Sequence, residues 1–338
     1  MSAVIEAKNI TKIFGESPET AVRMLEQGSS KADVQAETGQ VVGLNRVSIA
    51  VEPGEIFVVM GLSGSGKSTL IRHVNRLIEP TAGEMWVNGR NVLELNESDL
   101  RTFRRNELAM VFQNFGLLPH RSVIDNVAYG LEIRGAEKAE RRKKAAHWIE
   151  RVGLAGYEES QPHELSGGQQ QRVGLARALA MDTDILLMDE AFSALDPLIR
   201  SGMQDELKTL QRELNKTILF ISHDFDEAVK IGDRIAVLND GAIVQCDKPE
   251  NIILKPADDY VAEFVRDVNK ARVIHVGSIM EKDIETPCDH NVVGAASCED
   301  VLPLFAEHDW VGVTDEFGQR IGRITAKRVI AALARHAA

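Results

Sequence analysis

Hydrophobic and polar residues follow one another in two periods along the chain, and these periods predict strands and helices in alternation. Residues 2–14 alternate between apolar and polar side chains, and residues 41–60 are rich in β-branched side chains around a Pro-Gly turn, so both are predicted strand segments. After residue 180, apolar runs within 184–192 and 216–224 predict buried strands, each followed by a helical pattern. Strands that alternate with helices are typical of a largely parallel sheet with helices on both faces. The pattern therefore predicts an α/β fold.

The segment 16–40 predicts a helical insertion between two strands. Ser17 and Ser30 stand where helix N-caps are expected, and Gly28 and Gly39 stand where helices end. Two short helices between strands of one sheet are an addition to the basic fold.

Two further boundaries follow from the pattern. The residues from about 98 to 175 turn mostly helical and interrupt the sheet, so they predict an α-helical subdomain. After residue 270 a small α/β pattern begins afresh. We therefore expect one domain over 1–270 and a second over 271–338.

Composition narrows the classes of partner. The chain has 338 residues, 44% hydrophobic and 27% charged, with a formal net charge of −12. Such an acidic chain lacks the overall basic character of a general nucleic-acid binder, so no nucleic-acid partner is expected. Its three cysteines show no metal-ligand spacing, and no apolar run approaches the roughly 20 residues that span a membrane. We expect the protein to lie in a reducing compartment and not to cross a membrane itself.

A glycine-rich stretch carries the first sign of chemistry. The sequence GLSGSGKST matches the phosphate-loop pattern, and it follows an apolar strand and opens a helix, as that motif requires. Backbone N–H groups and a helix N-terminus bind phosphate oxygens in such loops, Lys67 reaches the β- and γ-phosphates, and Ser68 ligates Mg²⁺. The residues expected to bind ATP here are Gly61, Leu62, Ser63, Gly64, Ser65, Gly66, Lys67, Ser68 and Thr69.

Four polar residues at predicted strand ends complete the expected site. Asp189 ends the apolar run ILLMDE and can hold Mg²⁺, while Glu190 can polarise a water for attack on the γ-phosphate. His223 follows the next strand, and strand ends at one sheet edge converge on a ligand crevice, so it can contact the γ-phosphate and orient Glu190. Gln113 can touch Mg²⁺ or the water where a strand gives way to the helical subdomain. The catalytic set is Lys67, Glu190 and His223.

Taken together, these motifs resemble the ATP-binding cassette (ABC) superfamily over about residues 4–265. The motifs that carry the resemblance, in chain order, are GLSGSGKST (61–69), FQ (112–113), LSGGQ (165–169), ILLMDE (185–190), SALD (193–196) and ISHD (221–224). The resemblance implies a P-loop NTPase fold, with a RecA-like core and with antiparallel β and α-helical subdomains. It also implies ATP and Mg²⁺ as ligands.

The same resemblance implies a head-to-tail dimer of two copies of the chain. In that dimer LSGGQ of one copy closes on the ATP held by the other, so the partner's site would be completed by Ser166, Gly167, Gly168 and Gln169. Asp196 of the SALD motif would run along the seam. Phe14 matches the position whose aromatic ring stacks on adenine.

A finer resemblance is to the ATPase subunits of bacterial glycine betaine, proline and choline importers. It rests on the stretches at residues 12–39, 75–83 and 186–207. It implies a peripheral subunit on the cytoplasmic face of the inner membrane, which contacts permease subunits through the region around Gln113 and acts indirectly with a substrate-binding protein. The alternatives left open are a soluble cassette ATPase of cluster assembly or repair, and an importer motor for another small polar substrate.

The C-terminal residues 271–338 resemble a single, reduced CBS module. The run VGVTDEFGQRIGRIT followed by a helix matches the strand-turn-strand-helix of that module. Arg328 stands three residues after Thr325, where adenosine-binding modules usually carry Asp, and this departs from the nucleotide-sensing pattern. The alternatives are a dimer-stabilising or vestigial tail and a regulator of the response to osmotic or ionic strength.

Overall fold

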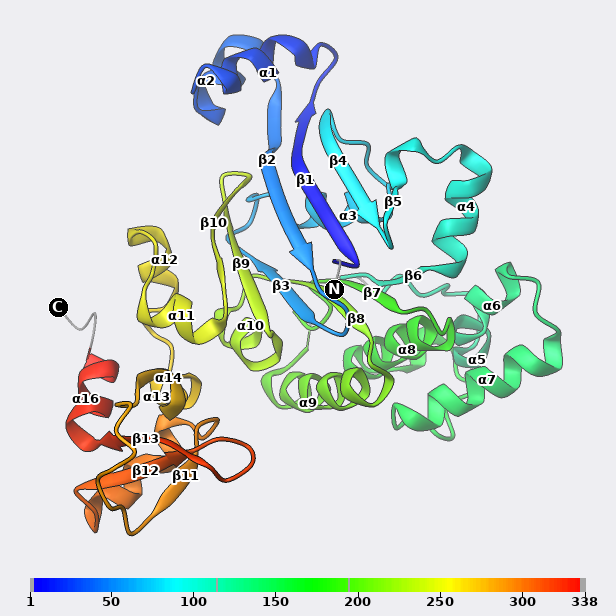
Figure 1. Cartoon of the computed structure of the whole chain (residues 1–338). Coiled ribbons are helices and arrows are strands. Elements are labelled where there is room, and N and C mark those ends of the chain that lie inside the picture. Colours follow the sequence, from blue (N-terminus) through cyan, green and yellow to red (C-terminus); the bar gives the residue numbers. More distant parts are fainter. Residues whose placement is uncertain (1–2, 114, 194, 335–338) are drawn as a thin grey trace. The chain divides into compact units, whose positions relative to one another are not determined.

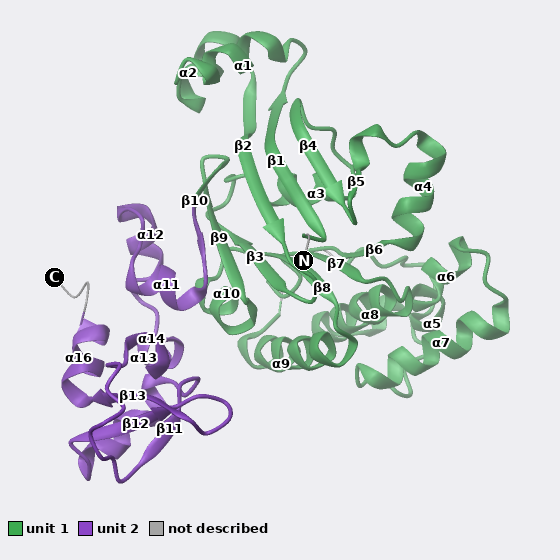
Figure 2. Ribbon diagram, in the orientation of Figure 1, with its two compact units in different colours: residues 1–244 green, residues 245–338 purple. Residues whose placement is uncertain are grey.

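The chain folds into two compact units. The computed structural model describes residues 3–113, 115–193 and 195–334. The first unit is Met1–Val244 and the second is Gln245–Ala338 (Figure 2). This division lies earlier than the boundary predicted after residue 270, because α11 (Pro249–Leu254) and α12 (Asp259–Phe264) cluster with the second unit.

An antiparallel sheet of four strands begins the first unit (Figure 1). Its order is β2 (Val41–Val51), β1 (Ile5–Phe14), β4 (Ala82–Val87) and β5 (Arg90–Asn91). β4 and β5 form a hairpin that turns at Asn88 and Gly89, whose φ angles of 50° and 72° suit the two-residue turns that match the twist of paired strands.

The second sheet has six strands and is largely parallel, as the sequence predicts. Its order is β10 (Ala242–Asp247), β9 (Arg234–Asn239), β3 (Ile56–Met60), β8 (Thr217–Ser222), β7 (Ile185–Asp189) and β6 (Leu108–Val111). The pairings from β9 through β6 are all parallel. The carboxyl ends of β3, β8, β7 and β6 therefore meet at one edge.

The other helices of the first unit pack against this sheet or lie in the predicted helical region. They are α3 (Lys67–Val74), α4 (Glu97–Asn106), α5 (Val123–Val127), α6 (Tyr129–Ile133), α7 (Lys138–Arg151), α8 (Gly167–Ala180), α9 (Pro197–Leu214) and α10 (Phe225–Ile231), with short 3₁₀ turns at Val92–Glu94 and Pro162–Glu164. Apolar residues of α5, α7 and α8 form a buried cluster of their own. Among the described helices, none combines the length and the apolar content that crossing a bilayer requires.

The helical insertion forms as predicted, with α1 (Pro18–Glu26) and α2 (Lys31–Thr38). Ser30 and Asp33 make a reciprocal capping box, and Gly39 ends α2 at a φ of 70°. Ser17 stands at the N-cap of α1 but makes no side-chain cap hydrogen bond.

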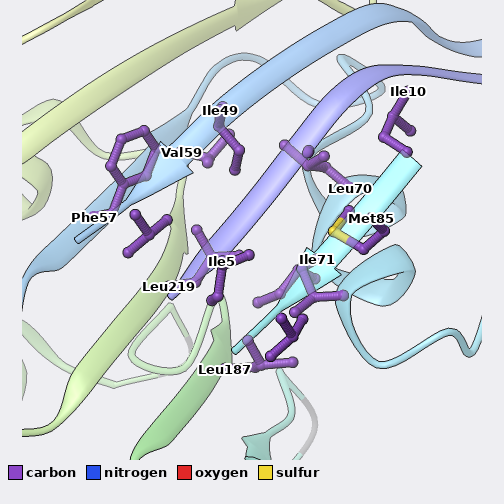
Figure 3. Packing of buried hydrophobic residues seen from close by; sticks show 14 of the residues in the cluster. Ile5, Ile10, Ile49, Phe57, Val59, Leu70, Ile71, Met85, Leu187 and Leu219 are labelled. Atoms are coloured by element: carbon purple, nitrogen blue, oxygen red, sulfur yellow. The ribbon is translucent and has the colours of Figure 1, made fainter. Parts of the chain in front are cut away.

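The main core lies between the two sheets and encloses α3. Figure 3 shows apolar side chains that come from both sheets and from this helix. Its labelled residues are Ile5, Ile10, Ile49, Phe57, Val59, Leu70, Ile71, Met85, Leu187 and Leu219. Burial of α3 on this scale fixes the helix whose N-terminus carries the phosphate loop.

The second unit contains a three-stranded sheet and short helices. Its further elements are α13 (Lys270–Val273), α14 (Val276–Ile279), β11 (Asn291–Val293), α15 (Cys298–Val301), a 3₁₀ turn at Leu302–Ala306, β12 (Trp310–Thr314), β13 (Arg320–Thr325) and α16 (Ala326–Ala334). The sheet order is β11-β12-β13. The predicted strand-turn-strand-helix is present in β12, β13 and α16, while the likeness to a CBS module stays a prediction.

Candidate functional site

The glycine loop between β3 and α3 has the backbone conformation that its composition predicts. Gly61, Gly64 and Gly66 have φ angles of 155°, 80° and 107°, which residues with a side chain rarely adopt. A Cβ on Gly61 would lie 2.1 Å from the Leu238 carbonyl oxygen, so the chain passes too closely there for any other residue. Gly66 is the N-cap of α3 and offers no side chain to its N–H groups. These donors remain for a phosphate.

Lys67 lies inside this loop, where a bound anion would need it. Its side chain is 4% exposed, and Nζ donates to the carbonyl oxygens of Gly61 and Leu62 at 2.9 and 3.0 Å. Burial lowers the pKa of the Lys67 ammonium, and the Glu190 and Asp189 carboxylates oppose that shift.

A second polar group of the loop is poised for a ligand. Ser65 Oγ is buried and has no hydrogen-bond partner among the described residues. Buried hydroxyls are normally satisfied, so an unsatisfied one inside a glycine loop fits a phosphate oxygen as its partner. Together with Lys67 it makes the loop suited to a phosphorylated ligand.

Ser68 and Asp189, two of the three expected Mg²⁺ ligands, lie in direct contact. Ser68 Oγ donates to Asp189 Oδ1 at 2.8 Å, and Arg72 Nη2 lies 3.3 Å from Asp189 Oδ2. The described residues hold no group of three or more His, Cys, Asp or Glu side chains that could bind a metal alone. A hydroxyl and one carboxylate fit a Mg²⁺ ion that shares its other positions with phosphate and water.

Glu190 is the point at which two other predicted residues meet. Its Oε2 accepts from Gln113 Nε2 at 3.0 Å and lies 3.3 Å from His223 Nδ1. Lys67 Nζ is 3.8 Å from Glu190 Oε1. The φ of Glu190 is 47°, a left-handed conformation that costs free energy in any residue other than glycine. The contacts around Glu190 must therefore hold it in this conformation.

Strand register explains why these residues converge. Met60 at the end of β3 lies opposite Ser222 of β8, and Asp189 of β7 lies opposite Ile221 of the same strand. Gln113 follows β6, which pairs with β7. Residues that come directly after parallel strands are therefore delivered to one edge, as predicted.

Phe14 stands at the end of β1, away from the parallel sheet. Its side chain is 42% exposed, and Lys12 Nζ lies 5.1 Å from the ring centroid. The ring packs against Gly43, where an added Cβ would lie 2.8 Å from it. An aromatic ring supported on one side and exposed in part suits stacking with a planar base.

Ser166 and Gln169 of the LSGGQ motif make reciprocal hydrogen bonds at the N-terminus of α8. Ser166 Oγ accepts from the Gln169 N–H at 3.3 Å, and Gln169 Oε1 accepts from the Ser166 N–H at 2.9 Å. Gly167 and Gly168 occupy the turn between them, and a Cβ on Gly168 would lie 2.9 Å from a methyl group of Ile199. The structure does not place these four residues beside Lys67, and their role at a partner's site stays a prediction.

Asp196, expected at the dimer seam, is the N-cap of α9. Its Oδ1 accepts from the Ile199 N–H at 3.1 Å. The SALD motif and the stretch after Gln113 each contain one residue outside the described part of the chain, Ala194 and Asn114.

Two arginines beside the site were not predicted from the sequence. Arg72 pairs with Asp189, and Arg200 pairs with Asp224, which follows His223. Arg72 stands four residues after Ser68, so its place on the Ser68 face of α3 follows from helix geometry. Arg200 carries no such signal, because its partner Asp224 lies 24 residues further along the chain, at the N-cap of α10.

Comparisons with known proteins agree with this geometry. A family model described as ABC transporter matches residues 44–193. The glycine betaine/carnitine transport ATP-binding protein of Listeria monocytogenes is 55% identical over 276 residues, which are 82% of this chain and 70% of that protein. The trimethylamine N-oxide transport system ATP-binding protein of Ruegeria pomeroyi is 50% identical over 325 residues, 96% of this chain and 95% of that protein.

A solved structure shows the same fold. A dimeric ATP-binding cassette in a post-hydrolysis state, bound to ADP and phosphate, is 33% identical with a TM-score of 0.62. The match covers 72% of this chain and 98% of that one.

Proposed function

We propose, from the premise that the chain belongs to the ABC transporter family of ATPase subunits, that it powers an importer for small quaternary amines. The observation that carries this proposal is the cluster of Lys67, Asp189, Glu190 and His223 at one sheet edge, beside a loop shaped for phosphate. We place the chain on the cytoplasmic face of the membrane, where ATP is available, as a peripheral subunit of the importer.

Each residue of the cluster has a role in hydrolysis. The N–H groups of the glycine loop and the Lys67 ammonium bind the β- and γ-phosphates and stabilise the charge that develops during transfer. Ser68, Asp189 and Gln113 would hold Mg²⁺, which supplies charge neutralisation at the phosphates. Glu190 orients the attacking water and accepts its proton, and His223 keeps the Glu190 carboxylate aimed at that water. Phe14 stacks on the adenine.

We propose that two copies of the chain form the working enzyme. The chain has one phosphate loop and one LSGGQ motif, whose Ser166 and Gln169 lie at the N-terminus of α8. A helix N-terminus attracts anions, so it can bind the γ-phosphate of a nucleotide held by a second copy. The dimeric state of the solved relative supports this arrangement.

A groove beside Gln113 suits a helix of a permease subunit. It encloses about 360 Å³ between β6, α6 and α8. Its lining is mainly apolar and includes Leu77, Met110, Phe112, Leu118, Tyr129 and Arg177. Leu77 and Phe112 are 52% and 38% exposed, so the groove presents apolar surface that a partner can cover.

The substrate class rests on the relatives. Glycine betaine and trimethylamine N-oxide both carry a nitrogen with four substituents and a formal positive charge. The relatives named for the oxide align along nearly the whole chain, whereas the betaine relatives are longer and align over about four fifths of it. This coverage adds trimethylamine N-oxide to glycine betaine, choline and proline as a candidate substrate.

The function is tested by Glu190→Gln. The amide keeps the size of the side chain but accepts no proton, so we expect ATP hydrolysis to fall by at least about a hundredfold while ATP binding persists. Steady-state ATPase assays and equilibrium dialysis with ATP measure both quantities. Undiminished turnover would remove Glu190 from its role.

Co-purification separates transport from a soluble ATPase. We expect a detergent extract of cells that express the tagged chain to yield it together with an integral membrane protein. Recovery of a soluble dimer alone would contradict the importer. In the reconstituted complex, the amine that raises ATP turnover identifies the substrate.

A further inference from the structure

Arg200, near the start of α9, contacts two different loops at the edge of the site. Its Nη1 donates to Asp224 Oδ2 at 3.1 Å, and its Nη2 donates to the carbonyl oxygens of Ser193 and Leu195 at 3.4 and 3.1 Å. The first loop carries His223, and the second follows Glu190 directly. One guanidinium therefore links the loop that follows Glu190 to the residue that follows His223. We call Glu190 and His223 the catalytic pair.

The loop after Glu190 holds that residue in its strained conformation. The Glu190 carbonyl oxygen accepts from the Ser193 N–H at 3.2 Å and from Ser193 Oγ at 2.9 Å, and the Glu190 N–H donates to the Ile221 carbonyl at 3.1 Å. A glutamate with a positive φ would move to a more favourable backbone conformation if such contacts did not hold it. Arg200 binds the carbonyl of the same Ser193, so it restrains the residue that restrains Glu190.

The loop that carries His223 is fixed in the same way. Asp224 caps α10 through Oδ1, which accepts from the Glu227 N–H at 3.1 Å, and this leaves Oδ2 for Arg200. The Asp224 N–H donates to Ser222 Oγ at 3.0 Å. His223 thus lies between two anchored neighbours, with its Nδ1 3.3 Å from Glu190 Oε2.

Stability alone gives a poor account of Arg200. Its side chain is 26% exposed, yet Nε is buried with no hydrogen-bond partner in the part of the chain that the structure describes. A buried donor without a hydrogen-bond partner lowers the free energy of unfolding, which is a cost to the fold. The contacts of the other two nitrogens must offset this cost, and they act on the geometry of the site.

We propose that Arg200 is a positioning residue for ATP hydrolysis, which sets the distance between Glu190 and His223 by linking the loops that carry them. The proposal rests on the ATPase function proposed above. The loop from Ser193 to Asp196 is also expected at the seam with a second copy.

The first test compares variants of the full chain by steady-state ATPase kinetics. We expect Arg200→Gln to lower kcat by about tenfold to a hundredfold, as small misplacements of catalytic groups do, with the KM for ATP within about twofold of wild type. Arg200→Lys keeps the charge opposite Asp224 but cannot contact both loops, so its kcat should lie between. Arg212→Gln, an exposed position on the same helix, is the matched control and should change neither constant.

The second test asks whether Arg200 acts through Asp224. Asp224→Asn keeps an acceptor for the Glu227 N–H and weakens the charged pair with Arg200. If the two residues form one link, the double variant with Arg200→Gln should have the kcat of the more impaired single variant. The proposal would be overturned if the kcat losses of the two single variants multiplied in the double variant. It would also be overturned if kcat stayed unchanged and the fall in kcat/KM came from a higher KM.

Two controls keep the outcomes separate. Thermal unfolding checks that each variant is folded, and if Arg200→Gln does not fold, the kcat of Arg200→Lys decides. A wild-type chain without ATPase activity would refute the proposed function. If the wild-type chain hydrolyses ATP and the Arg200→Gln variant has the same kcat, only the role of Arg200 is refuted.

Discussion

Glu227 lies in a buried polar network beside His223, and the charge of its carboxyl group depends on pH. Glu227 is 6% exposed, and its carboxylate accepts from Ser222 Oγ at 2.5 Å and from Gln204 Nε2 at 3.1 Å. Burial raises the pKa of the Glu227 carboxyl above its usual value of 4.5, while these hydrogen bonds and the charge of Arg200 oppose the shift. The network therefore connects stability to the site.

This shift predicts a pH-dependent loss of stability. The native state keeps the Glu227 proton to a higher pH than the unfolded chain does, so the free energy of unfolding falls as pH rises from about 4.5 through the native pKa. Glu227→Gln has no proton to lose. We expect its free energy of unfolding, relative to wild type, to be more favourable near pH 8 than near pH 4 in urea titrations.

The control is Glu37→Gln, which alters an exposed carboxylate of the helical insertion. Its difference from wild type should change little over the same pH range. An equal difference for Glu227→Gln at both pH values would show that Glu227 does not titrate between the two states.

Among the elements, the helical insertion packs in a buried cluster apart from the main core. Ala21, Leu25 and Val34 form a small buried cluster with Ile13 and Val42, the ends of the strands that the insertion joins. The cluster is separate from the core that encloses α3. Local changes in the insertion should therefore affect stability without affecting the phosphate loop.

The two helices of the insertion provide a matched pair of capping variants. Ser30→Ala removes the hydroxyl that accepts from the Asp33 N–H, so we expect a loss of about 1 kcal/mol in the free energy of unfolding. Ser17→Ala removes a side chain that caps nothing, so its loss should be a few tenths of a kcal/mol. Denaturant titration measures both. Equal losses, or a changed KM for ATP in Ser30→Ala, would contradict this account.

For the whole molecule, the sequence predicts most of the fold and the contacts around Glu190. Gln113 and His223 could be placed beside Glu190 because each follows a strand of a parallel sheet, where sequence position and spatial edge coincide. Arg200 could not be placed, because its partners are mainly backbone oxygens and depend on which strands are neighbours. The boundary at 270 differs from the division after Val244 because α11 and α12 carry no composition signal that assigns them to either unit.

The proposed dimer predicts complementation between two inactive chains. Lys67→Ala removes the ammonium at the phosphates, and Ser166→Asp keeps a good N-cap but places a negative charge toward the partner's γ-phosphate. Each variant alone should be nearly inactive. Equal mixing yields about one half mixed dimers, each with one intact site, so ATPase activity should recover to about one quarter of wild type.

Activity in the mixture is measured after the chains exchange, with total protein held constant. A mixture of Lys67→Ala with Glu190→Gln is the control, because both changes affect the same half of the composite site. That mixed dimer has no intact site, and recovery there would contradict the assignment of Ser166 to the opposite half.

The hydrogen bonds of Lys67 have a consequence for inhibition. Its ammonium already lies in the phosphate loop, bound to the neutral carbonyl oxygens of Gly61 and Leu62. A compact dianion would exchange these bonds for charge-assisted ones and would also satisfy the free hydroxyl of Ser65. Sulfate and inorganic phosphate are therefore natural competitors of ATP, and an inhibitor needs little beyond a tetrahedral anion to occupy the centre of this loop.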